Sequence, residues 1–184
     1  MRTSVAALMT AVSIAALASS AQALEMDYKP YVGVDYNFSD VSAEGLKPNY
    51  NSASVNLGTS YNRYFGTELF YQKSGKESNR VEGAKVTSSF DAFGLDLMGY
   101  LPLGCFDTWS LIGTAGVGEY HFNEKVVGIS KGTDNGYGYR AGLGVQYNVN
   151  NDWSIRSMAR YVNFDQLDHL DHMMEYSVGA KYNF

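Results

Sequence analysis

The chain ends in Tyr176-Ser-Val-Gly-Ala-Lys-Tyr-Asn-Phe184, a stretch in which apolar and polar side chains alternate without a break. Successive side chains of a β-strand point to opposite faces, so this stretch predicts a strand with one apolar and one polar face. A strand that lies between lipid and a polar lumen needs this arrangement. The stretch also finishes the chain on an aromatic residue, with Tyr182 two positions earlier. We therefore predict a membrane-spanning strand here and test the rest of the chain against it.

The first 23 residues have the pattern of a secretory signal. Arg2 gives a basic start, Val5–Leu17 is apolar, and Ala21-Gln-Ala23 supplies the small residues of a signal-peptidase site. The apolar stretch is too short to cross a bilayer as a helix, which takes about 20 residues. We expect residues 1–23 to be a cleaved signal peptide and residues 24–184 to form one outer-membrane domain.

Composition restricts the class of protein further. Residues 24–184 keep 13 of the 14 basic residues and all 19 acidic ones, a net charge of −6, which argues against a nucleic-acid partner. The 15 Tyr, 9 Phe and 2 Trp residues suit aromatic girdles at two membrane interfaces. Cys105 is alone, so it forms no internal disulfide, and its role stays open. A chain that crosses the membrane with β-strands must form a closed barrel, because lipid offers no hydrogen-bond partners to the backbone groups of an open sheet edge.

Alternation of the same kind recurs along the chain. The expected strands are Val32–Phe38, Ser52–Ser60, Phe65–Lys73, Ser89–Leu101, Trp109–Tyr120, Tyr137–Tyr147, Trp153–Tyr161 and Tyr176–Phe184. The long connections between them are expected to be loops: Ser39–Asn49, Ser74–Val86, His121–Asn135 and Asp165–His172. An even strand number with long outer loops and short periplasmic turns is typical of outer-membrane proteins. We therefore predict an all-β fold, an eight-stranded antiparallel transmembrane up-and-down β-barrel.

Part of the chain resembles a known family. The resemblance is carried by Gly136-Tyr-Gly-Tyr-Arg-Ala-Gly-Leu-Gly-Val-Gln-Tyr147, Trp153-Ser-Ile-Arg-Ser-Met-Ala-Arg-Tyr-Val-Asn-Phe164, Tyr176–Phe184 and the glycine-rich Gly113–Gly118. These stretches are similar to strands of the small OmpA-like and OmpX-like outer-membrane barrels, a group with opacity-type and Ail-type surface proteins. The resemblance implies a place in the bacterial outer membrane. It also implies that Tyr182 and Phe184 form the signal read by the barrel-assembly machinery.

The chain departs from this family in two ways. Met158 stands where the seventh strand of the family usually carries an acidic residue between two inward arginines. We also expect no periplasmic peptidoglycan-binding domain after Phe184.

Charges of both signs fall on the faces that should point into the barrel. They are Asp35, Glu68, Asp96, Arg140, Arg156, Arg160, Glu175 and Lys181. Eight strands enclose a lumen just wide enough for side chains to fill, and buried ions must pair. We expect a salt-bridge network that fills the lumen. In that network Glu68 should reach across the barrel to a cation, either Arg140, Arg156 or Lys181. A narrow ion path lined by the same residues is the alternative.

The histidines and one acidic stretch are the residue types of two further kinds of site, a deacylase active site and a metal site. Some barrels of this size are lipid A deacylases with a His-x-Ser pair, but none of His121, His169 and His172 has a serine at that spacing. The stretch Asp165–His172 places carboxylates and imidazoles close together, in Asp165, Asp168, His169, Asp171 and His172. These residue types bind divalent metals, yet no zinc or calcium spacing matches, and a solvated loop explains the same composition.

The sequence thus predicts a non-enzymatic outer-membrane β-barrel protein, with a surface-attachment or envelope-structural role carried by its extracellular loops. A narrow pore or conduit for small solutes is the alternative, and a lipid-modifying barrel enzyme comes third. The expected partners are outer-membrane lipid and lipopolysaccharide, the barrel-assembly machinery, and an extracellular ligand bound through the loops. No cofactor is expected.

Overall fold

The computed structural model describes residues 28–43, 49–75, 77–81, 84–104, 108–126, 129–165 and 170–184, and all its regular elements there are strands. The predicted signal peptide, Cys105, Asp168 and His169 lie outside these residues. The strands are β1 (Lys29–Ala43), β2 (Asn49–Ser60), β3 (Phe65–Ser74), β4 (Glu77–Val81), β5 (Ala84–Leu103), β6 (Trp109–Val126), β7 (Ile129–Asn148), β8 (Trp153–Asp165) and β9 (Leu170–Asn183). The described part of the chain contains no helix long and apolar enough to span a bilayer.

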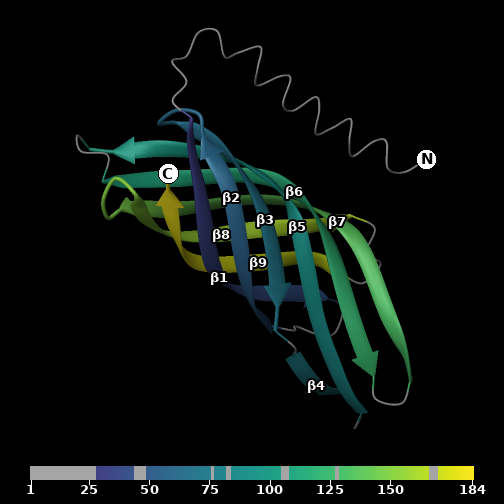
Figure 1. Cartoon of the computed structure of the whole chain (residues 1–184). Helices are drawn as coiled ribbons and strands as arrows, with labels where there is room; N and C mark the ends of the chain where they lie inside the picture. Colours follow the sequence, from purple (N-terminus) through teal and green to yellow (C-terminus); the bar gives the residue numbers. More distant parts are fainter. Residues whose placement is uncertain are drawn as a thin grey trace.

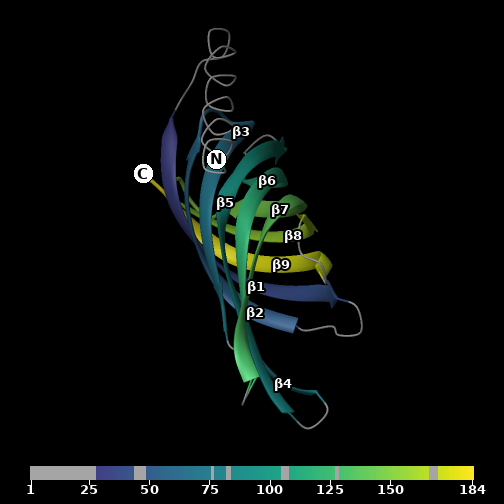
Figure 2. The ribbon, with the colours of Figure 1, turned by 90° about the vertical axis from the view of Figure 1, so that its right-hand side faces the viewer.

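The strands close into a barrel, seen in two views in Figures 1 and 2. Neighbours follow the order β3-β2-β1-β9-β8-β7-β6-β5, and a further pairing of β3 with β5 completes the ring. Every pairing is antiparallel. Strand β4 pairs with the outer end of β5 and takes no part in the ring. The predicted eight-stranded antiparallel barrel is therefore confirmed, with the closing stretch in β9 between β8 and β1.

Side chains alternate across the barrel wall as the sequence indicates. On β7, Leu143 is exposed on the lipid-facing side, whereas Arg140 and Gln146 are buried in the lumen. The same holds on β3, where Leu69 faces out and Glu68 is buried. Because the lipid-facing side must be apolar and the lumen side polar, the period of two is preserved wherever a strand crosses the membrane.

Short turns close one end of the barrel. In the turn before β3, the Asn62 Oδ1 accepts the backbone N–H groups of Tyr64 and Phe65, at 2.8 and 3.0 Å. In the turn before β8, the Asn150 Oδ1 accepts those of Asp152 and Trp153, at 2.9 and 2.7 Å. Short turns lie on the periplasmic side of outer-membrane barrels, which places the opposite end outside the cell.

The outer ends of the strands correct the predicted loops. Strands β5, β6 and β7 are 20, 18 and 20 residues long. Much of the expected loops Ser74–Val86 and His121–Asn135 is therefore paired strand, and so are residues 39–43 and 170–172. Beyond the membrane neither face of a sheet meets lipid, so the apolar alternation that marks a strand in the sequence disappears while the backbone pairing continues.

These outer ends form one projecting sheet, which we call the arm. The arm consists of β4 with residues 84–90 of β5, 121–126 of β6 and 129–136 of β7. Figure 1 shows it running to the lower right, away from the C-terminus, and Figure 2 shows it below the ring of strands.

Candidate functional site

The centre of the lumen is organised around the guanidinium of Arg156 on β8. Its Nη1 and Nη2 donate to Glu68 on β3, at 2.6 and 3.0 Å, and its Nε and Nη2 donate to Asp35 on β1, at 3.0 and 2.7 Å. All three side chains are at most 1% exposed. Strands β3 and β8 lie four places apart in a ring of eight, so the Glu68–Arg156 pair crosses the full width of the barrel. Of the cations considered for Glu68, Arg156 is its partner.

Lys181 on β9 balances the second carboxylate of this centre from a distance. Its Nζ lies over the ring of Tyr31, 4.3 Å from the centroid, and 5.2 Å from that of Tyr100. The Tyr31 hydroxyl in turn donates to Glu68 at 2.9 Å. Two carboxylates, Asp35 and Glu68, thus meet two buried cations, one by direct hydrogen bonds and one through an aromatic ring. Neither tyrosine is predicted as part of this centre, because Tyr31 precedes the expected strand Val32–Phe38 and Tyr100 carries no charge.

A second ion pair joins Arg140 on β7 to Asp96 on β5. The Arg140 Nε donates to the Asp96 Oδ1 at 2.7 Å, and its Nη2 pairs with the Asp96 Oδ2. The guanidinium also lies 3.5 Å from the centroid of the Phe70 ring. Both charged side chains are at most 3% exposed, so the pair is held away from water.

A glycine on the strand between lies under each of these contacts. Asp96, Gly116 and Arg140 are consecutive cross-strand partners on β5, β6 and β7. Asp35, Gly179 and Arg156 repeat the arrangement on β1, β9 and β8, as do Tyr31, Gly58 and Glu68 on β1, β2 and β3. A Cβ at Gly116 would collide with the Asp96 carboxylate, at Gly179 with the Asp35 carboxylate, and at Gly58 with the Tyr31 ring. Glycine therefore leaves the space through which each polar pair reaches across a strand.

Arg160 on β8 is the third arginine of the lumen, and it is less completely paired than Arg156 and Arg140. Its Nη1 donates to Glu175 and Ser177 on β9, at 3.2 and 2.9 Å, and its Nη2 contacts the Sδ of Met158 at 3.2 Å. Its Nε has no hydrogen-bond partner among the described residues. Thioether sulfur is a weak acceptor, so Met158 supplies less than a carboxylate would.

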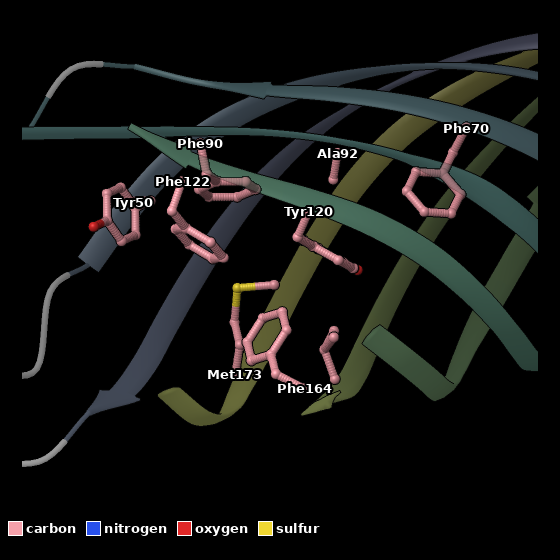
Figure 3. Packing of buried hydrophobic residues seen from close by; sticks show 9 residues of the cluster. Tyr50, Phe70, Phe90, Ala92, Tyr120, Phe122, Phe164 and Met173 are labelled. Atoms are coloured by element: carbon pink, nitrogen blue, oxygen red, sulfur yellow. The ribbon is translucent and has the colours of Figure 1, made fainter. Parts of the chain in front are cut away.

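An aromatic cluster packs in the lumen between these ion pairs and the arm. Figure 3 shows how its side chains lie against one another. Its members are Tyr50, Phe70, Phe90, Ala92, Tyr120, Phe122, Val162, Phe164 and Met173. Phe122 lies 5.5 Å from Phe90 and 5.7 Å from Phe164, centroid to centroid, while Phe164 is 5.1 Å from Tyr120. These are packing distances for aromatic rings, so the outer end of the lumen is occupied by side chains. The predicted salt-bridge network does not include this cluster.

The lumen residues of the sequence prediction therefore all lie inside the barrel. Asp35, Glu68, Asp96, Arg140, Arg156, Arg160, Glu175 and Lys181 are each at most 4% exposed. Four acids meet four cations, and the aromatic cluster lies beyond them. The residues predicted to form the assembly signal lie elsewhere: Phe184 is 74% exposed and packs edge-on against Tyr182, at 5.2 Å, on the outer wall at the periplasmic end.

Within the described residues the histidines lie on different strands, His121 on β6 and His172 on β9. His121 lies on the outer wall, with its Nε2 3.2 Å from Glu119 and its Nδ1 3.6 Å from Asp91. His172 stacks on Tyr161 at 5.4 Å, and Asp165 ends β8. The side chain of Asp171 lies outside the described part. No group of three or more His, Cys, Asp or Glu side chains is arranged to hold a metal ion in that part.

The arm presents a free sheet edge outside the membrane. Pairing of β7 with β8 begins at Tyr137 and Asp165, so residues 129–136 of β7 have no strand on that side among the described residues. Their other side is paired with β6, except where the register shifts between Ile129 and Gly132. An edge of eight residues is about 26 Å long at 3.3 Å per residue, and its N–H and C=O groups form a template for another strand.

Solved structures of outer-membrane proteins share this architecture. Neisserial surface protein A is similar with a TM-score of 0.71 at 15% identity, over 84% of this chain and 97% of that one. Ail of Yersinia pestis, solved with the heparin analogue sucrose octasulfate, is similar with a TM-score of 0.63 at 17% identity, over 86% and 100%. OprG of Pseudomonas aeruginosa has a TM-score of 0.59 at 14% identity, over 87% and 97%. At these identities the likeness shows the fold alone.

No curated protein matches the chain by sequence. The family described as "Outer membrane protein beta-barrel domain" matches it over residues 4–184. Together with the closed barrel, the apolar outer wall and the structural neighbours, this match places the protein in the bacterial outer membrane. The chain belongs to the outer membrane protein β-barrel family.

Proposed function

We propose that this protein is a non-enzymatic surface protein that attaches to extracellular partners through its arm, with the barrel as a closed anchor in the outer membrane. The observation that carries the proposal is the free edge of β7 at residues 129–136, held beyond the membrane by the paired strands β4–β7. Exposed edges accept extended peptides by main-chain hydrogen bonds, which gives affinity without a preformed pocket.

The contacts that join the arm to the barrel support this use. Its base is tied to the barrel by the aromatic cluster, in which Phe90 and Phe122 come from the inner ends of the arm strands. The Tyr50 hydroxyl of β2 also donates to the Ser88 Oγ of β5 at 2.9 Å. A fixed edge binds with a smaller loss of conformational entropy than a loop that must first be ordered.

The contents of the lumen favour an anchor over a pore. The ion pairs of Arg156 and Arg140 occupy its centre, and the aromatic cluster occupies its outer end. Moving ions through this space would mean separating buried pairs, and each unpaired buried ion costs several kcal/mol. The proposed absence of catalysis rests on the same crowding and on the isolated positions of His121 and His172.

Shortening the arm tests the proposal. Residues 123–133 are replaced by Asn-Gly, which leaves Phe122 and Asp134 as the closing pair of a two-residue hairpin and keeps the aromatic cluster. Bacteria that express the full chain should be retained on surfaces coated with fibronectin or collagen, polypeptides whose main chain can bind a sheet edge. Bacteria that express the shortened chain should lose at least tenfold in retention on the same coating.

Two controls make the result specific. Equal surface levels and heat-modifiable migration of both proteins show that the shortened barrel is inserted and folded. Replacing Thr133 by Pro, which removes one backbone donor of β7, is the smaller matched change. Equal retention of the full and shortened chains on every coating would refute attachment through the arm and leave the structural role.

A further inference from the structure

The lipid-facing wall is uneven halfway between its two aromatic girdles. On β5–β8 the outward side chains at this depth are small: Gly99, Gly113, Ala115, Ala141, Ser157 and Ala159. On β1, β2 and β3, in the opposite half of the barrel, most outward side chains are large, among them Val34, Val55, Leu57, Leu69 and Tyr71. Because its side chains are smaller, we call the wall of β5–β8 the recessed half.

The recessed half carries two hollows with a projection between them. The first, about 950 Å³, lies over Gly99, Gly113, Ala115 and Ala141, between Leu97 and Tyr161. The second, about 420 Å³, lies over Ser157 and Ala159, between Val145 and Tyr176. Leu143 borders both hollows and is 74% exposed. It therefore stands out from the wall between the two depressions.

This relief suits contact between protein surfaces within lipid. Apolar burial gives no driving force there, because lipid tails are as apolar as leucine, so association depends on close van der Waals packing. Small residues allow backbones to approach, and a projecting side chain that enters a recess increases the number of contacts. No charged residue lies on the outward face of β5–β8 between the girdles, so no ion has to be buried by such a contact.

We propose that this face is the interface of a homodimer, in which Leu143 of each copy enters the larger hollow of the other. Every copy is inserted in the same orientation, so a twofold axis along the membrane normal brings this face against the same face of a second copy. One surface supplies both the projection and the recess, so the contact is satisfied twice in each dimer. The proposal is independent of the arm and of its ligand.

The substitution Gly113→Leu tests the interface. A Cβ at Gly113 would meet only the Leu143 Cδ2, at 3.9 Å, so a larger side chain fits within the chain while it fills the hollow. Leu143→Ala removes the projection instead. Ala53→Leu, on the outward face of β2, places a leucine on the opposite half of the wall and serves as the control.

Sedimentation equilibrium in a density-matched detergent, over a hundredfold range of protein-to-detergent ratio, measures the association constant. The full chain and Ala53→Leu should dimerise equally, whereas Gly113→Leu and Leu143→Ala should each lower the association constant at least tenfold. Heat-modifiable migration checks that all four proteins are folded. A monomeric full chain, or unchanged dimerisation of Gly113→Leu, would overturn the proposal. The proposal would also be overturned if the full chain were a monomer with bound phospholipid and Gly113→Leu no longer bound that lipid. The hollow would then be a binding site for an acyl chain.

Discussion

Replacing Glu68 by Gln removes one charge from the centre of the lumen while almost preserving the shape of the side chain. Glu68 is fully buried and accepts three hydrogen bonds, two from Arg156 and one from Tyr31. After the change, Arg156 keeps Asp35 and Lys181 keeps its aromatic contacts, but two cations face a single carboxylate. The substitution therefore leaves uncompensated positive charge in a space closed to water.

The expected loss in the free energy of unfolding follows from the number of cations and carboxylates that remain at the centre. Removing one partner of a buried ion pair costs about 3–5 kcal/mol. Asp35 still binds the same guanidinium, and the amide oxygen of Gln can accept one of its N–H groups. We therefore expect a loss of about 3 kcal/mol, a substantial part of the 5–15 kcal/mol that stabilises a typical domain.

Denaturant titration of the protein in phospholipid vesicles measures this loss, with the fluorescence of Trp109 and Trp153 at the periplasmic end as the probe. Glu119→Gln is the matched control, because Glu119 pairs with His121 on the outer wall and its side chain is 33% exposed. A partly exposed pair of this kind contributes less than about 1 kcal/mol. Equal losses for the two variants would refute the reasoning.

A double variant separates charge from shape. Lys181→Met added to Glu68→Gln restores one cation to one carboxylate at the centre. If charge balance is the cause, the two substitutions together should cost less than the sum of their separate losses, by about 1–3 kcal/mol. Additive losses would show that Lys181 does not compensate Glu68.

Three further substitutions test other parts of the wall and lumen. Gly179→Ala places a methyl group against the Asp35 carboxylate and the Val34 carbonyl and should cost about 1–3 kcal/mol in the same titration, whereas the outward Gly99→Ala, with 3.6 Å to its nearest atom, should cost little. Phe122→Ala opens the aromatic cluster and should cost about 3–5 kcal/mol; a loss under 1 kcal/mol would mean that the cluster does not pack as a core. Leu143→Arg puts a charge at mid-membrane and should cost about 2–4 kcal/mol, more than Gln146→Arg on the lumen side; the reverse order would mean that the faces of β7 are exchanged.

The sequence predicts the membrane-spanning part of this fold well, because two different solvents act on its two faces. Leu143 and Arg140 must lie on opposite sides of β7 once one side meets lipid and the other a narrow lumen. The same constraint places Glu68 inside from the alternation of β3 alone. A slip of one residue would turn every charged side chain of a strand toward the lipid, so the inward face of each strand is strongly specified.

Outside the membrane, lipid and lumen no longer act on opposite faces of a strand. Polar side chains occupy both odd and even positions in residues 121–126 and 129–136. Their pattern therefore does not distinguish a paired strand from a loop, and the sequence predicts loops for most of the arm. The contacts across the lumen also cannot be predicted from the sequence pattern. The cross-strand row of Asp35, Gly179 and Arg156 depends on the register of three strands, which the alternation of each strand does not fix.

The aromatic cluster was missed for a related reason. Phe90 and Phe122 continue the inward positions of β5 and β6 beyond the lipid-facing band, into stretches expected to be loops. The side-chain direction of an apolar residue cannot be assigned in a loop. The position of Phe90 and Phe122 inside the barrel can therefore be inferred only once β5 and β6 are known to extend this far.

Recording in a planar bilayer tests the central claim, that the lumen is closed by buried ion pairs and the aromatic cluster. Purified full-length protein, inserted at an applied voltage in salt solution, should give no steady conductance, and Glu119→Gln on the outer wall should behave in the same way. Discrete, reproducible current steps from the unaltered protein would contradict the account and identify the lumen as a pore.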